Sequence, residues 1–207
     1  MKSVQLDASK YTMQQLGQIY DLRIAQDVQQ AAAQEFYDAV DMNDEQVALL
    51  QKYLSLVIDA QSEFSQVLKD DHRDLTELHR LNEKTDEAKG EFLSSISLDK
   101  NQCALLEKYA SKTGIVQKLC MEAIFDGINP LHWHMVKVPA FKEVVKRLRE
   151  EDYGMTQAGL GESLRVSESC ITRMENGKSR PRDMMLQLIS VLFDISFDFL
   201  KASRDAA

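Results

Sequence analysis

Glycine and proline are scarce in this sequence, and no long apolar run occurs in it. Among 207 residues there are 8 glycines and 3 prolines, so few positions interrupt a chain of ordinary hydrophobic content, which favours helices. There is no run of about 18 apolar residues, as a membrane-spanning helix needs, and the start MKSVQLDASK lacks the apolar core of a signal peptide. We therefore expect an all-α, cytoplasmic protein with no membrane partner.

Chemically reactive side chains form no recognisable site in the sequence. The three cysteines are far apart and show no Cys-x-x-Cys spacing: Cys103, Cys120 and Cys170. They fit reduced thiols better than a disulfide framework or a zinc site. The stretch 132–134, His-Trp-His, has no further spaced ligands, and His72 and His79 are interpreted as surface groups. We expect no metal site, no cofactor, no catalytic residue and no enzyme activity, because no phosphate-binding loop or nucleophile elbow is present either.

Charge is divided unevenly along the chain, whose formal net charge is −8. Residues 1–135 contain 13 basic and 22 acidic side chains, whereas residues 136–207 contain 12 and 11. Five basic and two acidic side chains lie between positions 165 and 182. The positive patch is therefore local, and the rest of the chain is acidic enough to repel a polyanion.

Apolar residues recur at three-to-four spacing through residues 1–128, which predicts an acidic helical bundle. The expected helices cover about 11–40, 44–68, 72–96, 100–112 and 114–127, and Asn43 and Asp44 offer a cap for the second of them. The residues expected to face the core are Met13, Leu16, Ile19, Tyr20, Leu22 or Arg23, Ala33, Phe36, Tyr37, Val47, Leu50, Leu54, Val57, Ile58, Phe64 and Leu68. Leu75, Leu78 and Leu81 stand among many charges, so this stripe fits either an ordinary core or a surface for a partner.

A break follows the bundle at residues 129–138, which we interpret as a linker. Pro130 and Pro139 bracket an aromatic stretch that cannot be one straight helix. Trp133 is expected to wedge between the two domains. The second domain is then expected to cover residues 139–207.

Five short helices are predicted in this second domain. They cover about 139–151, 156–164, 167–176, 182–193 and 196–202. Pro139 suits a first helical turn, Thr156 and Ser167 suit N-caps, and Gly177 suits a helix end. The core of the last two helices is expected to contain Met185, Leu188, Ile189, Leu192 and Phe199.

Two helices separated by Arg165 and Val166 form a helix-turn-helix pattern. The stretch GMTQAGLGESLRVSESCITRMENGKSRP, residues 154–181, resembles the Cro/CI-type (XRE-family) helix-turn-helix, and residues 139–202 fit the five-helix, lambda-repressor-like domain of that family. The marks that carry the resemblance are Thr156, Gln157, Leu160, Leu164, Val166, Ser167, Ile171, Glu175, Asn176, Gly177, Lys178 and Pro181. Together they are specific, although each alone is weak.

The resemblance implies which residues contact double-stranded DNA. Residues 167–175 would enter the major groove, with Ile171 and Met174 pointing inward. Base readout would fall to Glu168, Ser169, Thr172 and Arg173. Phosphate contacts would fall to Gln157, Asn176, Lys178, Ser179, Arg180 and Arg182. Glu168 has a second interpretation, as a residue that only stabilises the positive end of its helix.

Three positions depart from the family pattern: Gly161 replaces the usual alanine, Gly159 a common glutamate, and Arg165 the usual turn glycine. A glycine inside a helix costs about 1 kcal/mol relative to alanine. The helix over 156–164 is therefore expected to be looser than in typical members.

The function expected from these features is sequence-specific transcriptional regulation, by a homodimeric repressor that reads a palindromic operator. The acidic region 1–128 is the expected source of the dimer contact. One alternative is an antitoxin that represses its own operon while residues 1–128 bind the toxin. Another is a regulator whose first domain senses a ligand and shifts the DNA-binding geometry.

Overall fold

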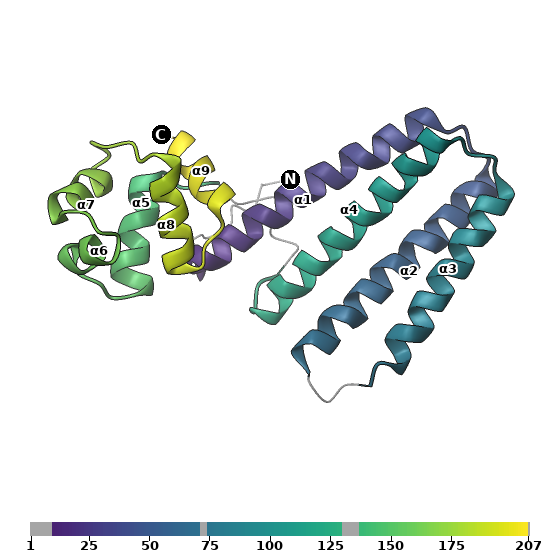
Figure 1. Cartoon of the computed structure of the whole chain (residues 1–207), viewed down its shortest axis with the longest axis horizontal. Coiled ribbons are helices and arrows are strands. Elements are labelled where there is room, and N and C mark those ends of the chain that lie inside the picture. Colours follow the sequence, from purple (N-terminus) through teal and green to yellow (C-terminus); the bar gives the residue numbers. More distant parts are fainter. Residues whose placement is uncertain (1–9, 71–73, 130–136, 207) are drawn as a thin grey trace, which may run out of the picture. The chain divides into compact units, whose positions relative to one another are not determined.

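The computed structural model describes residues 10–70, 74–129 and 137–206. Every regular element in these ranges is a helix, which confirms the all-α prediction (Figure 1). The contacts divide the chain into two compact units. One unit contains residues 24–125, and the other contains the described residues up to Arg23 together with those from Asp126 on. No helix in the described ranges is long and apolar enough to cross a membrane.

The unit of residues 24–125 is a bundle of α2 (Asp44–Lys69), α3 (Thr76–Ser95), α4 (Lys100–Phe125) and the second part of α1 (Met13–Ala39). Helices α2 and α3 form an antiparallel pair, and α4 packs on α2 (Figure 1). Its core consists of Phe36, Val40, Leu50, Tyr53, Leu54, Ala88, Phe92, Leu106 and Ala110. This arrangement is the predicted helical bundle.

Polar contacts join the first part of α4 to the second part of α1. The Gln102 amide donates to the carbonyl of Ala39 at 2.7 Å, and Lys108 pairs with Glu35 at 2.5 Å. Near the first of these contacts, Asn43 begins α2 with a reciprocal capping box that includes Gln46. The predicted cap at this position is therefore confirmed.

The prediction of two short helices over 100–112 and 114–127 was wrong, because α4 is continuous from Lys100 to Phe125. Gly114 lies inside it, and a side chain at that position would meet Val57 of α2 only at an ordinary contact distance of 3.8 Å. A single glycine costs a helix about 1 kcal/mol, which the packing of α4 on α2 outweighs. Glycine alone is therefore a weak signal for a helix end.

Several residues expected in the bundle core are exposed. These are Tyr37, Ile58, Phe64 and Leu68. The period of the pattern was correct, but the apolar stripe on α2 is wider than the surface that α3 and α4 cover. Leu75 is exposed at the start of α3, whereas Leu78 and Leu81 are half-buried.

The C-terminal unit contains the predicted short helices. They are α5 (Phe141–Arg147), a π-helical turn η3 (Leu148–Asp152), α6 (Gln157–Ser163), α7 (Glu168–Glu175), α8 (Asp183–Phe193) and α9 (Phe197–Asp205). Buried apolar side chains from all of these helices form its core, among them Val144, Leu148, Leu160, Ile171 and Phe199. The unit is the expected helix-turn-helix fold.

Three local expectations for this unit were wrong. Helix α5 begins at Phe141 with Ala140 as the N-cap, so Pro139 precedes the first turn instead of lying in it. Ser167 is the N-cap residue of α7 but makes no capping bond, because its hydroxyl contacts that of Ser169 at 2.9 Å. Leu188 and Leu192 are exposed instead of buried, whereas Ile189 and Phe199 lie in the core. Most of residues 129–138, including Trp133, lie outside the described ranges.

The start of α1 belongs to the C-terminal unit. The backbone N–H of Met13 donates to Asp152 at 2.9 Å, and the ring of Tyr20 lies 5.9 Å from that of Phe199. Close approach is possible because Gly17 has no side chain: a Cβ there would lie 3.2 Å from Ile195. The sequence-based division at residues 128 and 139 did not include this segment, since nothing local shows which surface an amphipathic helix covers.

Candidate nucleic-acid interface

Helices α6 and α7 are joined by a four-residue turn. Thr156 caps α6 by accepting a hydrogen bond from the N–H of Gly159 at 3.0 Å, as predicted. The turn reverses direction at Arg165, whose φ of 57° lies in the left-handed region that glycine adopts most easily. The N–H of Val166 then donates to the carbonyl of Gly161 at 2.8 Å. Arg165 therefore adopts the left-handed conformation that glycine favours, at the position where the family pattern usually has glycine.

Helix α7 has one buried and one exposed face. Ile171 and Met174 are buried, which confirms their predicted inward orientation. Glu168, Ser169 and Arg173 are exposed on the other face. Three of the four predicted readout residues are thus accessible to a ligand, as base readout requires.

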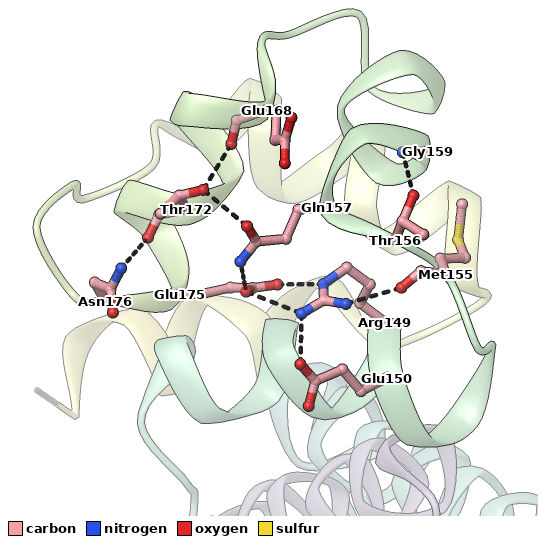
Figure 2. Close-up of polar contacts among 10 residues, drawn as sticks. All are labelled: Arg149, Glu150, Met155, Thr156, Gln157, Gly159, Glu168, Thr172, Glu175 and Asn176. Carbon is pink, nitrogen blue, oxygen red and sulfur yellow. Dashed lines mark hydrogen bonds and ion pairs between the residues drawn. The ribbon is translucent and has the colours of Figure 1, made fainter.

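A buried ion pair holds the C-terminal end of α7 against η3. Arg149 in η3 donates from Nε and Nη2 to the two carboxylate oxygens of Glu175, at 2.6 and 3.1 Å. Their side chains are 8% and 5% exposed. The remaining Arg149 donors reach the carbonyl of Met155 at 2.8 Å and the carboxylate of Glu150 at 2.7 Å. Figure 2 shows these contacts converging on the guanidinium group.

Gln157 extends this network to the middle of α7. Its amide nitrogen donates to Glu175 at 2.5 Å, and its amide oxygen accepts from the hydroxyl of Thr172 at 2.9 Å (Figure 2). Thr172 also contacts the carbonyl of Glu168 at 3.1 Å. Both ends of the Gln157 amide therefore have partners inside the protein. Its predicted phosphate contact stays a prediction, and the structure gives it a second task, the orientation of α7 on α6.

The charges of the pair stabilise each other. Burial by itself would raise the pKa of the Glu175 carboxyl, but hydrogen bonds from Arg149 and Gln157 outweigh burial and hold that pKa below its ordinary value. The pKa of Arg149 is raised, mainly by its hydrogen bond to Glu175. Glu175 is consequently ionised at neutral pH, and α7 is held by a charge-assisted contact.

The segment after α7 carries most of the predicted phosphate contacts. Gly177 has a φ of 67°, which ends α7 as predicted. The amide of Asn176 donates to the carbonyl of Thr172 at 2.8 Å, and Arg180 pairs with Asp205 at 2.7 Å. Lys178 and Arg182 are exposed, and neither side chain has a hydrogen bond or ion pair within the described ranges, as is also true of Arg173. Among the predicted DNA-contact residues in the described ranges, these three cations could bind a polyanion without losing an internal partner.

Sequence reasoning did not identify the role of Arg149 or the buried state of Glu175. Glu175 was recognised only as part of the motif, and Arg149 was not singled out. The two residues are separated by 26 positions in the chain. The sequence around each of them is the same as would be expected for a charged residue on the surface. In the described ranges, no group of three or more histidine, cysteine, aspartate or glutamate side chains is placed to hold a metal ion.

Substitution of Gly161 tests how closely α6 approaches the backbone of the turn and the start of α7. A Cβ on Gly161 would lie 2.8 Å from the carbonyl oxygen of Val166 and 3.3 Å from the nitrogen of Glu168, both backbone atoms. Overpacking of this kind costs about 1–3 kcal/mol, more than the gain of about 1 kcal/mol from helix propensity. We therefore expect Gly161→Ala to lower the free energy of unfolding by about 1 kcal/mol, as measured by urea denaturation.

Gly90 provides the matched control for this substitution. It lies inside α3 with nothing within 4 Å of a built Cβ. Gly90→Ala should therefore stabilise its helix by up to about 1 kcal/mol. If both substitutions stabilised the protein, the close approach of α6 to the turn would not explain the glycine at 161.

A family model described as Helix-turn-helix matches residues 145–200. No family model matches the N-terminal region. Comparison with curated proteins and with solved structures finds no match. The matched residues run from α5 to α9 and include the whole α6–turn–α7 arrangement. Residues 145–200 therefore form a helix-turn-helix domain of the XRE (Cro/CI) family, and the C-terminal unit is of a DNA-binding type.

Proposed function

We propose that this protein is a homodimeric transcriptional repressor that reads a palindromic operator through α7. The observation that carries the proposal is the exposed face of α7, which presents Ser169 and Arg173 and is followed in the chain by the exposed cations Lys178 and Arg182, neither of which has an ion pair within the described ranges. Arginine can bind guanine through two hydrogen bonds in the major groove. Lysine and arginine in the following segment would neutralise phosphates and position the domain.

The two residue groups are proposed to have separate tasks. Arg173 would discriminate between bases together with Glu168, which can only accept hydrogen bonds, for instance from cytosine N4. Lys178, Arg180 and Arg182 would contact phosphates, although Arg180 would first have to leave Asp205. Thr172 would contribute mainly by orienting α7, because its hydroxyl already contacts Gln157 and the Glu168 carbonyl.

The proposal is tested by selecting bound sequences from random duplex DNA with the full-length protein. The full chain is required because residues 10–23 pack against the DNA-binding unit. We expect an enriched site with two half-sites about 34 Å apart, or a multiple of that distance, as a symmetric dimer requires. Failure to enrich any site would contradict the proposal. Co-purification of a small protein encoded nearby would then favour the antitoxin alternative.

Substitution of Arg173 and of Lys178 is expected to affect DNA binding in different ways. Arg173→Ala should cost about 1–3 kcal/mol on the selected site and relax base preference at one position of each half-site. Lys178→Ala should weaken binding to all sequences about equally and reduce the slope of log affinity against log salt concentration by about one per protomer. Titrations of selected and random duplexes at several salt concentrations measure both effects.

Lys84 provides a control of the same charge outside the helix-turn-helix domain. It is exposed on α3, so Lys84→Ala should leave both affinity and salt slope unchanged. If Arg173→Ala and Lys178→Ala behaved alike on selected and random DNA, the assignment of reading and positioning residues would be incorrect.

A further inference from the structure

Helix α8 presents an apolar stripe to solvent. Val191 is 83% exposed and Met184 74%, the highest fractions among the large hydrophobic residues that the structure describes. Leu188 and Leu192, 46% and 39% exposed, lie on the same side at spacings of three to four residues. These four residues are here called the α8 stripe. The sequence predicted that Leu188 and Leu192 would close the core, so their exposure leaves a hydrophobic face without a partner inside the unit.

A shallow groove continues this surface toward α7. It has a volume of about 320 Å³, and its lining includes Cys170 and Met174 of α7 together with Met185 and Leu188 of α8. Methionine side chains adapt readily to a partner surface. The stripe and the groove therefore form one largely apolar surface beside α7, and the lining of the groove also contains Ser179, Arg180 and Arg182.

The charged residues at the two ends of α8 interact unfavourably with the dipole of the helix. Arg182 lies at its positive N-terminal end and Asp194 at its negative C-terminal end. Asp183 is already neutralised by an ion pair with Arg204. Within the described ranges, the Asp194 carboxylate has only the uncharged amide of Gln14 as a partner, at 3.2 Å, and Arg182 has no ion pair. A second α8 running antiparallel would bring Arg182 of one copy near Asp194 of the other and offset both unfavourable interactions with the helix dipoles. Arg182 would then make this pair in place of the phosphate contact proposed for it above.

We propose that α8 is the homodimer contact and that its partner is a second copy of this chain. A twofold axis near Leu188 places that residue beside its own copy, and the Met184 end of one stripe beside the Val191–Leu192 end of the other. Such an isologous contact needs a self-complementary surface, which the stripe and the two end charges supply. This dimer contact rests on the proposed function, in which two DNA-binding units read the two half-sites of a palindrome. It differs from the expectation that residues 1–128 supply the dimer contact.

The test is sedimentation of the full chain without DNA, compared between the wild type and Val191→Lys. We expect the wild type to dimerise at micromolar concentration. Val191→Lys should raise the dimer dissociation constant at least about tenfold, because it would place an unpaired charge in the contact. Its circular dichroism should be unchanged, since the side chain of Val191 is largely in solvent.

Val28→Lys is the matched control. Val28 is exposed on α1 within the other unit, so this variant should dimerise like the wild type. Reversing the end charges gives a second test: Asp194→Arg should weaken the dimer, and adding Arg182→Asp should restore it. The proposal is overturned if the wild type is monomeric at roughly 100 µM, if Val191→Lys dimerises like the wild type, or if Val28→Lys alone abolishes the dimer.

The dimer experiment and the DNA selection can fail independently of each other. A monomeric Val191→Lys protein together with a wild type that enriches no DNA site would support the dimer contact and contradict the regulator. A Val191→Lys protein that stays dimeric and binds a selected palindrome would support the regulator and place the dimer contact elsewhere.

Discussion

Replacing Glu175 with alanine is expected to lower the free energy of unfolding of the C-terminal unit by about 3–5 kcal/mol. The substitution would leave the buried guanidinium of Arg149 without its main partner and would also remove the acceptor of Gln157. An unpaired buried charge is costly because the interior replaces little of its hydration. Urea denaturation followed by circular dichroism measures the loss, and specific DNA binding should fall with it because α7 is no longer held in place.

Glu150 offers a control within the same network. Its carboxylate also contacts Arg149, at 2.7 Å, but its side chain is 44% exposed. Glu150→Ala should cost less than about 1 kcal/mol, as exposed ion pairs do. The double variant Arg149→Met with Glu175→Leu should recover much of the stability lost in Glu175→Ala, because it removes both buried charges. Equal effects of Glu150→Ala and Glu175→Ala would contradict the assignment of the buried pair.

The contribution of Glu175 should depend on pH in a defined direction. Its pKa is lower in the folded protein than its ordinary value, because hydrogen bonds to Arg149 and Gln157 outweigh burial. The stabilisation is therefore fully present above about pH 4.3, the ordinary glutamate value, and is lost as the pH falls through the lowered folded value. The stability difference between wild type and Glu175→Gln should shrink over that acidic range. A difference that grew on acidification would have the wrong sign.

Removing residues 1–23 is expected to destabilise the helix-turn-helix unit by about 3 kcal/mol or more. The deletion removes the Tyr20 contact with Phe199, which is worth about 0.5–1.5 kcal/mol as an aromatic pair. It also removes hydrogen bonds from Met13 to Asp152 and between Ser196 and Asp21, each worth about 1 kcal/mol, and the packing at Gly17. Amide hydrogen exchange in α8 and α9 should then be faster by about two orders of magnitude.

A point variant distinguishes this packing from a general effect of truncation. Tyr20→Ala should raise exchange in α9 in the full-length chain, because Phe199 lies in that helix. Tyr37→Ala changes the same residue type in the same helix, but Tyr37 contacts Phe36 and Tyr109 in the other unit. It should leave exchange in α9 unchanged. Unaltered protection of α9 after both the deletion and Tyr20→Ala would show that residues 10–23 are dispensable to the unit.

Local signals predicted the fold well. Apolar spacing predicted the helices, and the caps Asn43 and Thr156 and the end at Gly177 were correctly identified. Helix ends and interruptions were less accurate, as Gly114 shows, because a propensity difference of about 1 kcal/mol is easily overridden by packing. For the candidate site, the inward residues of α7 were correctly predicted, whereas the partners of Gln157 and Thr172 were not.

The sequence by itself determined that the protein is helical and that its C-terminal region carries an XRE-family helix-turn-helix, because caps, turn residues and apolar period all act within a few neighbouring positions. Only the tertiary structure decided that Arg149 and Glu175 form a buried pair, that residues 10–23 complete the DNA-binding unit and that the α8 stripe is left exposed. Each of these depends on which surfaces meet across long separations in the chain, and a side chain's type and spacing do not specify the partner that it finds there.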